Sequence, residues 1–214
     1  EEPRLVCPKA LAMYQRLIDE LPNSPLVDDA VYNKAFLFEE MGDHERANAI
    51  YAHLADAYPQ SPYVPEAYMR LGEYYFNPPL NALDEAIAYY KKVLEYRESK
   101  RYDEALYKLG WSFYRLSRYP EAISYFTMLV EGTPETEGYR PVGAEARTDL
   151  RDESMEYIAI SFIDFGGPGK CREYIRSVGD PPWGGPVLEK LGDIYREEKE
   201  DYLNAIAAYE AWLD

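Results

Sequence analysis

The sequence contains only two cysteines, Cys7 and Cys171, and only two histidines, His44 and His53. Two cysteines this far apart cannot make a disulfide framework or a metal ligand set, and both occupy positions that suit a small apolar residue of a helical core. The two histidines share no helical face with an obvious third ligand. We therefore expect no metal and no cofactor.

Basic residues are also scarce, with 23 Lys and Arg against 39 Asp and Glu, which gives a formal net charge of -16. Nucleic-acid binders and proteins that bind anionic membranes need a basic surface, so both classes are excluded. No apolar run approaches the length of a membrane span, and direct membrane insertion is not expected. The charge favours a basic partner.

Motifs of catalysis are absent as well. The run from Gly166 to Lys170 has the glycines and lysine of a phosphate-binding loop, but Asp164 stands where the first glycine belongs and Cys171 follows the lysine. A turn between helices explains this run. Carboxylates are abundant, yet no pair stands out as a general acid and base. We expect that the chain is not an enzyme.

What the sequence does contain is a helical hairpin at 103–130. Its first half places Leu106, Leu109 and Phe113 on one helical face, and its second half does the same with Ile123 and Phe126. Between the halves, Pro120 suits the first position of a new helix. Neither helix alone can bury its apolar face, so the hairpin needs similar hairpins on each side.

Similar hairpins are present along the chain. They predict a single repeat domain over 1–214, with a half repeat at 8–22 followed by full repeats at 28–61, 65–98, 103–130, 152–179 and 185–214. Two segments interrupt the regular pattern: residues 77–81 lengthen a turn, and residues 131–150 form an inserted loop. No segment has the alternation of a strand. The fold class is therefore all-α, a solenoid of antiparallel helix pairs.

Residue size recurs at fixed places in these repeats. The eighth place is small in each: Ala35, Gly72, Gly110, Ala159 and Gly192. A second small residue follows twelve to fourteen places later: Ala47, Ala86, Ala122, Cys171 and Ala205. Four places after it comes a large residue: Tyr51, Tyr90, Phe126, Ile175 and Tyr209. Two helices approach closely only where neither carries bulk, so we expect small residues to meet at the crossing and the large residue to lie beside it.

The repeats resemble tetratricopeptide repeats over essentially the whole chain. Leu-Gly at 71–72, 109–110 and 191–192, followed by an aromatic residue and then by alanine, is similar to the pattern of that family. The phrases Leu-Pro-Asn-Ser-Pro and Tyr-Pro-Gln-Ser-Pro between repeats further resemble bacterial envelope proteins of the BamD and Tol-Pal-associated type. This resemblance implies a right-handed superhelical scaffold that binds other proteins in the bacterial cell envelope, in the periplasm; the alternative is a cytoplasmic location.

The resemblance also implies that the first helix of each repeat lines a concave groove. The groove positions that carry rings are Tyr32, Phe36, Phe76, Tyr107, Trp111 and Tyr114. Their acidic rim consists of Asp29, Glu39, Glu40, Glu66, Glu73 and Glu104. Such a groove would bind a basic, apolar peptide or helix. Some tetratricopeptide repeat proteins hold the acidic C-terminal tail of a partner with Lys and Asn side chains. Here rings occupy the positions that this clamp would need, so such a clamp is not expected. The alternative is that the rings only pack against neighbouring helices.

Two hypotheses of function therefore stay open. The first is a protein-interaction scaffold within a larger envelope or assembly protein, and the second is a regulatory or positioning module of a larger enzyme or transporter. Because Trp212 and Leu213 make a poor polar cap, we expect a longer natural protein, with self-association through the open repeat ends as a third possibility.

Overall fold

The computed structural model describes residues 8–132 and 144–213, in which every regular element is an α-helix. The all-α prediction is confirmed. The chain divides into two compact units, unit 1 ending at Tyr102 and unit 2 beginning at Asp103, whereas the sequence predicts one domain. The physical reason is that a repeat contacts only its neighbours, so an array of repeats has no single core.

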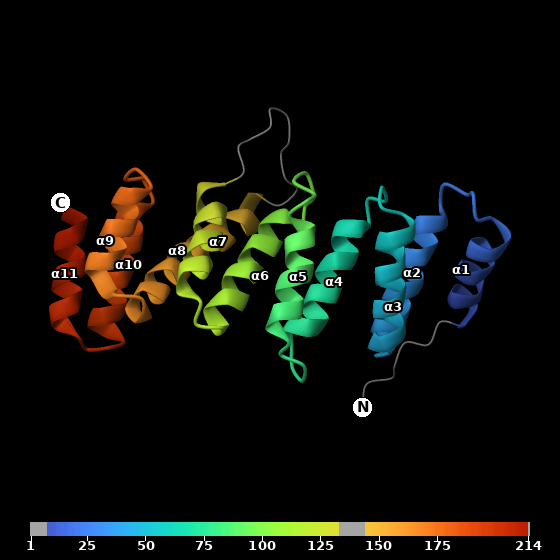
Figure 1. Ribbon diagram of the computed structural model, residues 1–214, viewed down its shortest axis with the longest axis horizontal. Coiled ribbons are helices and arrows are strands. Elements are labelled where there is room, and N and C mark those ends of the chain that lie inside the picture. Colours follow the sequence, from blue (N-terminus) through green and yellow to red (C-terminus); the bar gives the residue numbers. More distant parts are fainter. Residues whose placement is uncertain (1–7, 133–143, 214) are drawn as a thin grey trace. The chain divides into compact units, whose positions relative to one another are not determined.

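The described residues of unit 1 form five helices, each packed against the next (Figure 1). They are α1 (Pro8–Glu20), α2 (Val27–Glu40), α3 (His44–Ala57), α4 (Val64–Phe76) and α5 (Leu83–Val93). The predicted half repeat is α1, and the predicted repeats at 28–61 and 65–98 are the pairs α2–α3 and α4–α5. The turn before α3 uses Gly42 at a φ of 75°, which glycine adopts without strain, and Asp43 then caps α3 by accepting a hydrogen bond from the Arg46 N–H.

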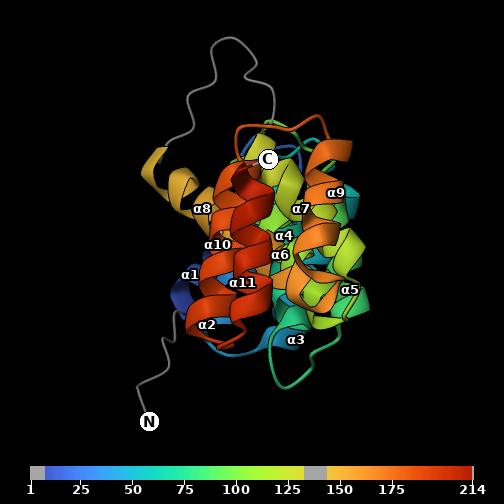
Figure 2. The ribbon, with the colours of Figure 1, turned by 90° about the vertical axis from the view of Figure 1, so that its left-hand side faces the viewer.

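Unit 2 contains six helices in its described residues. They are α6 (Tyr102–Arg115), α7 (Tyr119–Glu131), α8 (Ala144–Asp164), α9 (Gly167–Ser177), α10 (Gly184–Glu197) and α11 (Tyr202–Leu213). The last three pack against one another at the C-terminal end, as Figure 2 shows. No helix in the described part of the chain is long and apolar enough to cross a membrane.

Two predicted loops are shorter than expected. The predicted loop at 131–150 is wrong at both ends, because Glu131 belongs to α7 and α8 begins at Ala144; good helix formers in 144–150 extend that helix. The residues 133–143 lie outside the described ones. The predicted turn at 166–169 is wrong in the same way, since α9 begins at Gly167 and Pro168 occupies its first turn.

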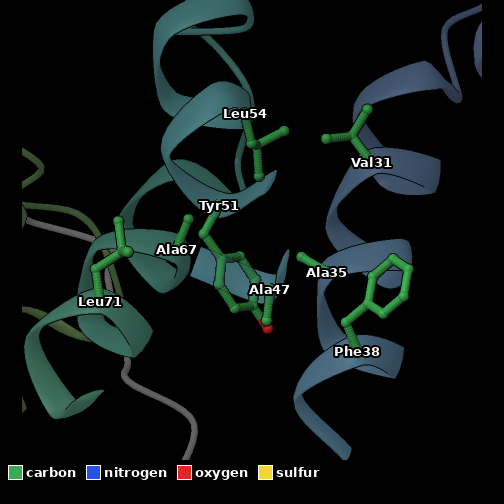
Figure 3. Close-up of a cluster of buried hydrophobic side chains, with 8 residues drawn as sticks. All are labelled: Val31, Ala35, Phe38, Ala47, Tyr51, Leu54, Ala67 and Leu71. Carbon is green, nitrogen blue, oxygen red and sulfur yellow. The ribbon is translucent and has the colours of Figure 1, made fainter. Parts of the chain in front are cut away.

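The core of unit 1 is a cluster of alternating small and large side chains (Figure 3). It is formed by Val31, Ala35 and Phe38 of α2, Ala47, Tyr51 and Leu54 of α3, and Ala67 and Leu71 of α4. Tyr51 is completely buried and lies among residues of all three helices. The small and large places found in the sequence therefore form the core where two consecutive repeats meet.

The structure corrects one detail of this packing, because the large ring lies directly on the glycine. A Cβ atom added at Gly110 would lie 2.5 Å from Phe126 Cε1, one at Gly72 would lie 2.4 Å from Tyr90 Cε1, and one at Gly192 would lie 2.5 Å from Tyr209 Cε1. The sequence predicts small residues meeting at the crossing with the ring beside it. Glycine is needed here because it leaves room for the ring of the second helix.

Helix α11 is more exposed than α7, the second helix of the repeat at 103–130. Ile206, Trp212 and Leu213 are 54%, 46% and 82% exposed. The corresponding places in α7, Ile123, Leu129 and Val130, are all buried. Self-association through this face stays a prediction, which light scattering at several protein concentrations tests; a constant molecular mass would contradict it.

Candidate functional site

The predicted site residues are divided between the two units, and each group is considered by itself. Unit 1 holds Tyr32, Phe36, Phe76, Glu39 and Glu73. Unit 2 holds Tyr107, Trp111 and Tyr114. All eight side chains are half-buried. Because they are neither fully buried nor fully exposed, their immediate contacts decide what each group can bind.

In unit 1 the predicted acidic rim is paired with arginines of the same unit. Arg70 Nε lies 3.1 Å from Glu66 Oε1, and its Nη1 lies 3.5 Å from Glu39 Oε1 and 3.9 Å from Glu73 Oε2. Arg101 adds a second cation, with Nη2 donating to Glu66 Oε1 at 3.0 Å. The sequence predicts these carboxylates as a rim for a basic partner, but much of their charge is compensated internally.

Tyr51 joins the core of unit 1 to this charged network. Its hydroxyl donates a hydrogen bond of 2.7 Å to Glu39 Oε2. Burial, together with this bond, raises the pKa of Tyr51 far above its ordinary value. The phenol therefore stays protonated and keeps Glu39 in a fixed position beside Arg70.

The rings of unit 1 also have partners within the unit. Tyr32 stacks on Tyr63 with ring centroids 4.8 Å apart, and the Tyr63 hydroxyl donates to Asp29 Oδ1 at 2.6 Å. The guanidinium of Arg70 lies 5.9 Å from the centre of the Phe36 ring. These contacts hold the rings in place, and partner binding by this group stays a prediction.

In unit 2 the predicted rings form a continuous aromatic surface, here called the α6–α8 surface. It consists of Tyr107, Trp111 and Tyr114 of α6, Tyr119 of α7 and Tyr157 of α8. Trp111 is central, with its ring centroid 4.3 Å from that of Tyr157 and 6.0 Å from that of Tyr114. Tyr114 in turn lies 5.8 Å from Tyr119. Each ring contacts at least one other, so the surface is held rigid before any partner binds.

Three carboxylates of α8, Glu153, Glu156 and Asp164, accompany these rings. The Tyr107 hydroxyl donates to Glu153 Oε2 at 2.6 Å, and the Tyr119 hydroxyl donates to Asp164 Oδ2 at 3.4 Å. Among the side chains of residues 8–132 and 150–213, no lysine or arginine forms an ion pair with any of the three. The α6–α8 surface therefore keeps its negative charge, unlike the group in unit 1.

Burial and the hydrogen bond to Glu153 raise the pKa of Tyr107 to about 12. An unfolded tyrosine ionises near pH 10, so the unfolded state loses this proton first and stability falls as the pH rises from about 10 to 12. We expect NMR of ¹³Cζ-labelled tyrosine to show a phenol titrating near pH 12 that disappears in Tyr107→Phe. The control Tyr202→Phe removes a largely exposed phenol and should leave that titration unchanged; its persistence in Tyr107→Phe would contradict the assignment.

Tyr157 and Arg70 were not predicted as site residues, although both cover a predicted ring. Each occupies the sixth place of its repeat and lies over the residue at the ninth place of the repeat before it: Arg70 over Phe36, and Tyr157 over Trp111. In the repeat at 152–179, the sequence instead suggests Glu156, Ile160 and Ile163 as groove residues. A comparison of sixth with ninth places across repeats would have identified the missing residues.

Family models with the description tetratricopeptide repeat match residues 29–61 and 80–135. The chain contains tetratricopeptide repeats. Its predicted solenoid fold class is confirmed. The crystal structure of BtubC (BKLC) from P. vanneervenii aligns with a TM-score of 0.55 and 14% identity over 96% of this chain and 86% of that one. A tetratricopeptide repeat protein from Parabacteroides merdae ATCC 43184 aligns with a TM-score of 0.47 and 17% identity over 94% of this chain and 70% of that one. No curated protein matches the sequence.

Tetratricopeptide repeats mediate protein–protein interactions and are typically non-catalytic. Two other predictions can be followed in the structure. Cys171 is buried as expected, and burial raises the pKa of its thiol to about 12, so the thiol stays protonated; Cys7 lies outside the described residues. The described residues contain no cluster of His, Cys, Asp and Glu that could hold a metal ion.

Proposed function

We propose that this tetratricopeptide repeat protein is a scaffold whose α6–α8 surface binds a basic and apolar segment of a partner polypeptide. The observation that carries the proposal is the pair Trp111 and Tyr157, half-buried and 4.3 Å apart, beside carboxylates that no cation of the described chain pairs with. Rigid aromatic side chains bury a large area at low entropic cost, which is why they dominate the energetics of interfaces.

The same surface suits a cation. The faces of Trp and Tyr rings attract lysine and arginine, and this attraction strengthens where water is excluded. Glu153, Glu156 and Asp164 add charge that steers a basic segment toward the rings. Unit 1 offers less of this attraction, because Arg70 and Arg101 already compensate its carboxylates. We therefore assign the main contact to unit 2.

Affinity capture with the native-length protein, followed by titration of the captured partner, tests the proposal. Trp111→Ala is expected to weaken binding about thirtyfold, since truncation of an aromatic anchor costs about 2 kcal/mol. The control Met128→Ala removes a 50% exposed side chain on α7 and should leave the affinity unchanged. Raising the salt concentration should weaken binding to the native protein.

A second variant separates binding from folding. Glu156 is exposed and forms no ion pair within the described residues, so Glu156→Lys should leave the melting temperature unchanged. The same substitution should lower the affinity for the partner about tenfold at low salt. If Trp111→Ala lowers the melting temperature and neither variant changes the affinity, the rings are structural and the proposal is wrong.

The wider role in a bacterial envelope assembly is part of this proposal and is supported by the linker phrases Leu-Pro-Asn-Ser-Pro and Tyr-Pro-Gln-Ser-Pro. Cell fractionation of the native-length protein tests it, and recovery in the cytoplasm would contradict it. The second candidate, a positioning module of a larger enzyme or transporter, predicts instead that a catalytic or transport domain is encoded in the same gene.

A further inference from the structure

Unit 1 contains a cavity of about 780 Å³ that the proposed function does not use. It lies between the α2–α3 turn and the segment Asn77–Leu80, which links α4 to α5. Glu39 from the end of α2 and Arg70 from α4 also line it. Its volume falls within the range of ligand sites in proteins.

The linking segment is unusual for this chain. Six residues, Asn77–Ala82, separate α4 from α5. The corresponding turns are shorter, with Met41–Asp43 in the repeat at 28–61 and Leu116–Arg118 in the repeat at 103–130. Residues 77–81 are all exposed. A stretch that buries none of its own side chains contributes little to stability, so its effect is expected through the cavity that it helps to form.

The charge of the cavity favours a cation. Its carboxylates and guanidinium groups are Glu39, Asp43, Glu45 and Glu73 against Arg46 and Arg70, an excess of two carboxylates. Both arginines are engaged by these same carboxylates, Arg46 in an ion pair with Asp43 and Arg70 with Glu39 at 3.5 Å. Neither is therefore available to attract an anion, whereas Glu45 is exposed, forms no ion pair within the described residues and can attract a cation.

Part of the lining is apolar. Pro78, Pro79 and Leu80 form this part, and Leu80 is 43% exposed. Tyr74 also lines the cavity, with its ring 5.9 Å from that of His44. Prolines have no N–H to donate, so this segment offers carbonyl acceptors and apolar surface, which suits the N–H groups and aliphatic side chains of an extended peptide.

We propose that this cavity binds an extended segment of another polypeptide, in which a lysine or arginine faces Glu45 and an adjacent aliphatic residue lies against Leu80 and Pro79. The site goes beyond the proposed function, because it lies in the other unit and shares no residue with the α6–α8 surface. Each can therefore fail without the other.

An NMR titration of the ¹⁵N-labelled full chain tests this site with two matched peptides, both acetylated and amidated. One alternates leucine with lysine, and the other alternates leucine with glutamate. The lysine peptide is expected to shift the amide signals of Glu45 and Leu80, and the glutamate peptide is not. Leu80→Ser should lower the affinity for the lysine peptide about fivefold, and Glu45→Lys should lower it about tenfold.

The matched control is Glu85→Lys. Glu85 lies in the first turn of α5, as Glu45 lies in the first turn of α3, and both are exposed, so both reversals disturb a helix N-terminus equally. Glu85 does not line the cavity, and its reversal should leave the affinity unchanged.

Three results would overturn the inference: equal affinity for the two peptides, no shift at Glu45 and Leu80 up to millimolar peptide, or unchanged affinity in both Leu80→Ser and Glu45→Lys. Trp111→Ala, measured in parallel, separates this site from the proposed function. If only Trp111→Ala loses binding of the lysine peptide, the inference is overturned and the proposed function stands. If Leu80→Ser and Glu45→Lys lose binding of this peptide, the inference is supported, independently of the result for Trp111→Ala.

Discussion

Gly110→Ala is expected to lower the free energy of unfolding by about 3 kcal/mol, although alanine is the better helix former by about 1 kcal/mol. The added Cβ would lie 2.5, 2.6 and 2.7 Å from three atoms of the Phe126 ring. That ring is fully buried, so it can move only if the packing of α6 on α7 changes. Chemical denaturation monitored by circular dichroism measures the loss.

Two further variants show whether the ring contact causes the loss. Gly169→Ala places the same methyl group on α9, where no atom lies within 4 Å, and it should stabilise the protein by about 0.5–1 kcal/mol. Adding Phe126→Leu to Gly110→Ala makes room for the Cβ, so the two changes together should cost at least about 1 kcal/mol less than their sum. Equal effects of Gly110→Ala and Gly169→Ala would show that the ring does not need the glycine.

Arg70→Ala is expected to lower the free energy of unfolding by about 2 kcal/mol, because it leaves Glu39, Glu66 and Glu73 close together around a vacated position. The Arg70 side chain is 28% exposed, so solvent screening keeps the loss below that of a fully buried pair. Part of the loss is the packing of the guanidinium on Phe36. Thermal or denaturant unfolding measures it.

The control for this variant is Arg16→Ala. Arg16 forms an exposed ion pair with Glu20 on α1, and its removal should leave the free energy of unfolding nearly unchanged. Arg70→Lys keeps the charge and should recover more than half of the loss, and 1 M salt should reduce the loss in Arg70→Ala by screening the three carboxylates. A loss no greater than that of Arg16→Ala would mean that the network is only incidental to stability.

The repeats could be predicted from sequence because their signal is local and redundant. The glycines at 72, 110 and 192 are each followed 16 to 18 residues later by a large ring, Tyr90, Phe126 and Tyr209, so each repeat supports the assignment of the others. The errors fell at helix ends. Ala144–Leu150 follows a run of Gly, Pro and Thr that suggests a loop, yet nothing in periodicity marks where a helix of good helix formers begins.

The site was predicted less well, because charge pairing depends on contacts between repeats. Sequence identified Glu39 as acidic, but it could not show that Arg70 of the next repeat lies against it. The pairs of Arg70 with Glu66 and Glu73 lie within α4 at the spacing of helical neighbours, and the sequence did offer that signal. Tyr157 was missed for the same reason, since its partner Trp111 is distant along the chain. A residue's place on its own helix predicts the face that it occupies, whereas its partner depends on how the following repeat packs.

Photo-crosslinking tests the binding surface most directly. A photoreactive amino acid placed at Tyr114, on the α6–α8 surface, is compared with the same amino acid at Met128, an exposed position on α7 of the same unit. We expect the partner captured by the native-length protein to crosslink at position 114 and not at position 128, and the crosslinked segment to contain lysine or arginine beside aliphatic residues. Crosslinking at position 128 alone, or equally at both positions, would contradict the assignment of the α6–α8 surface as the binding site.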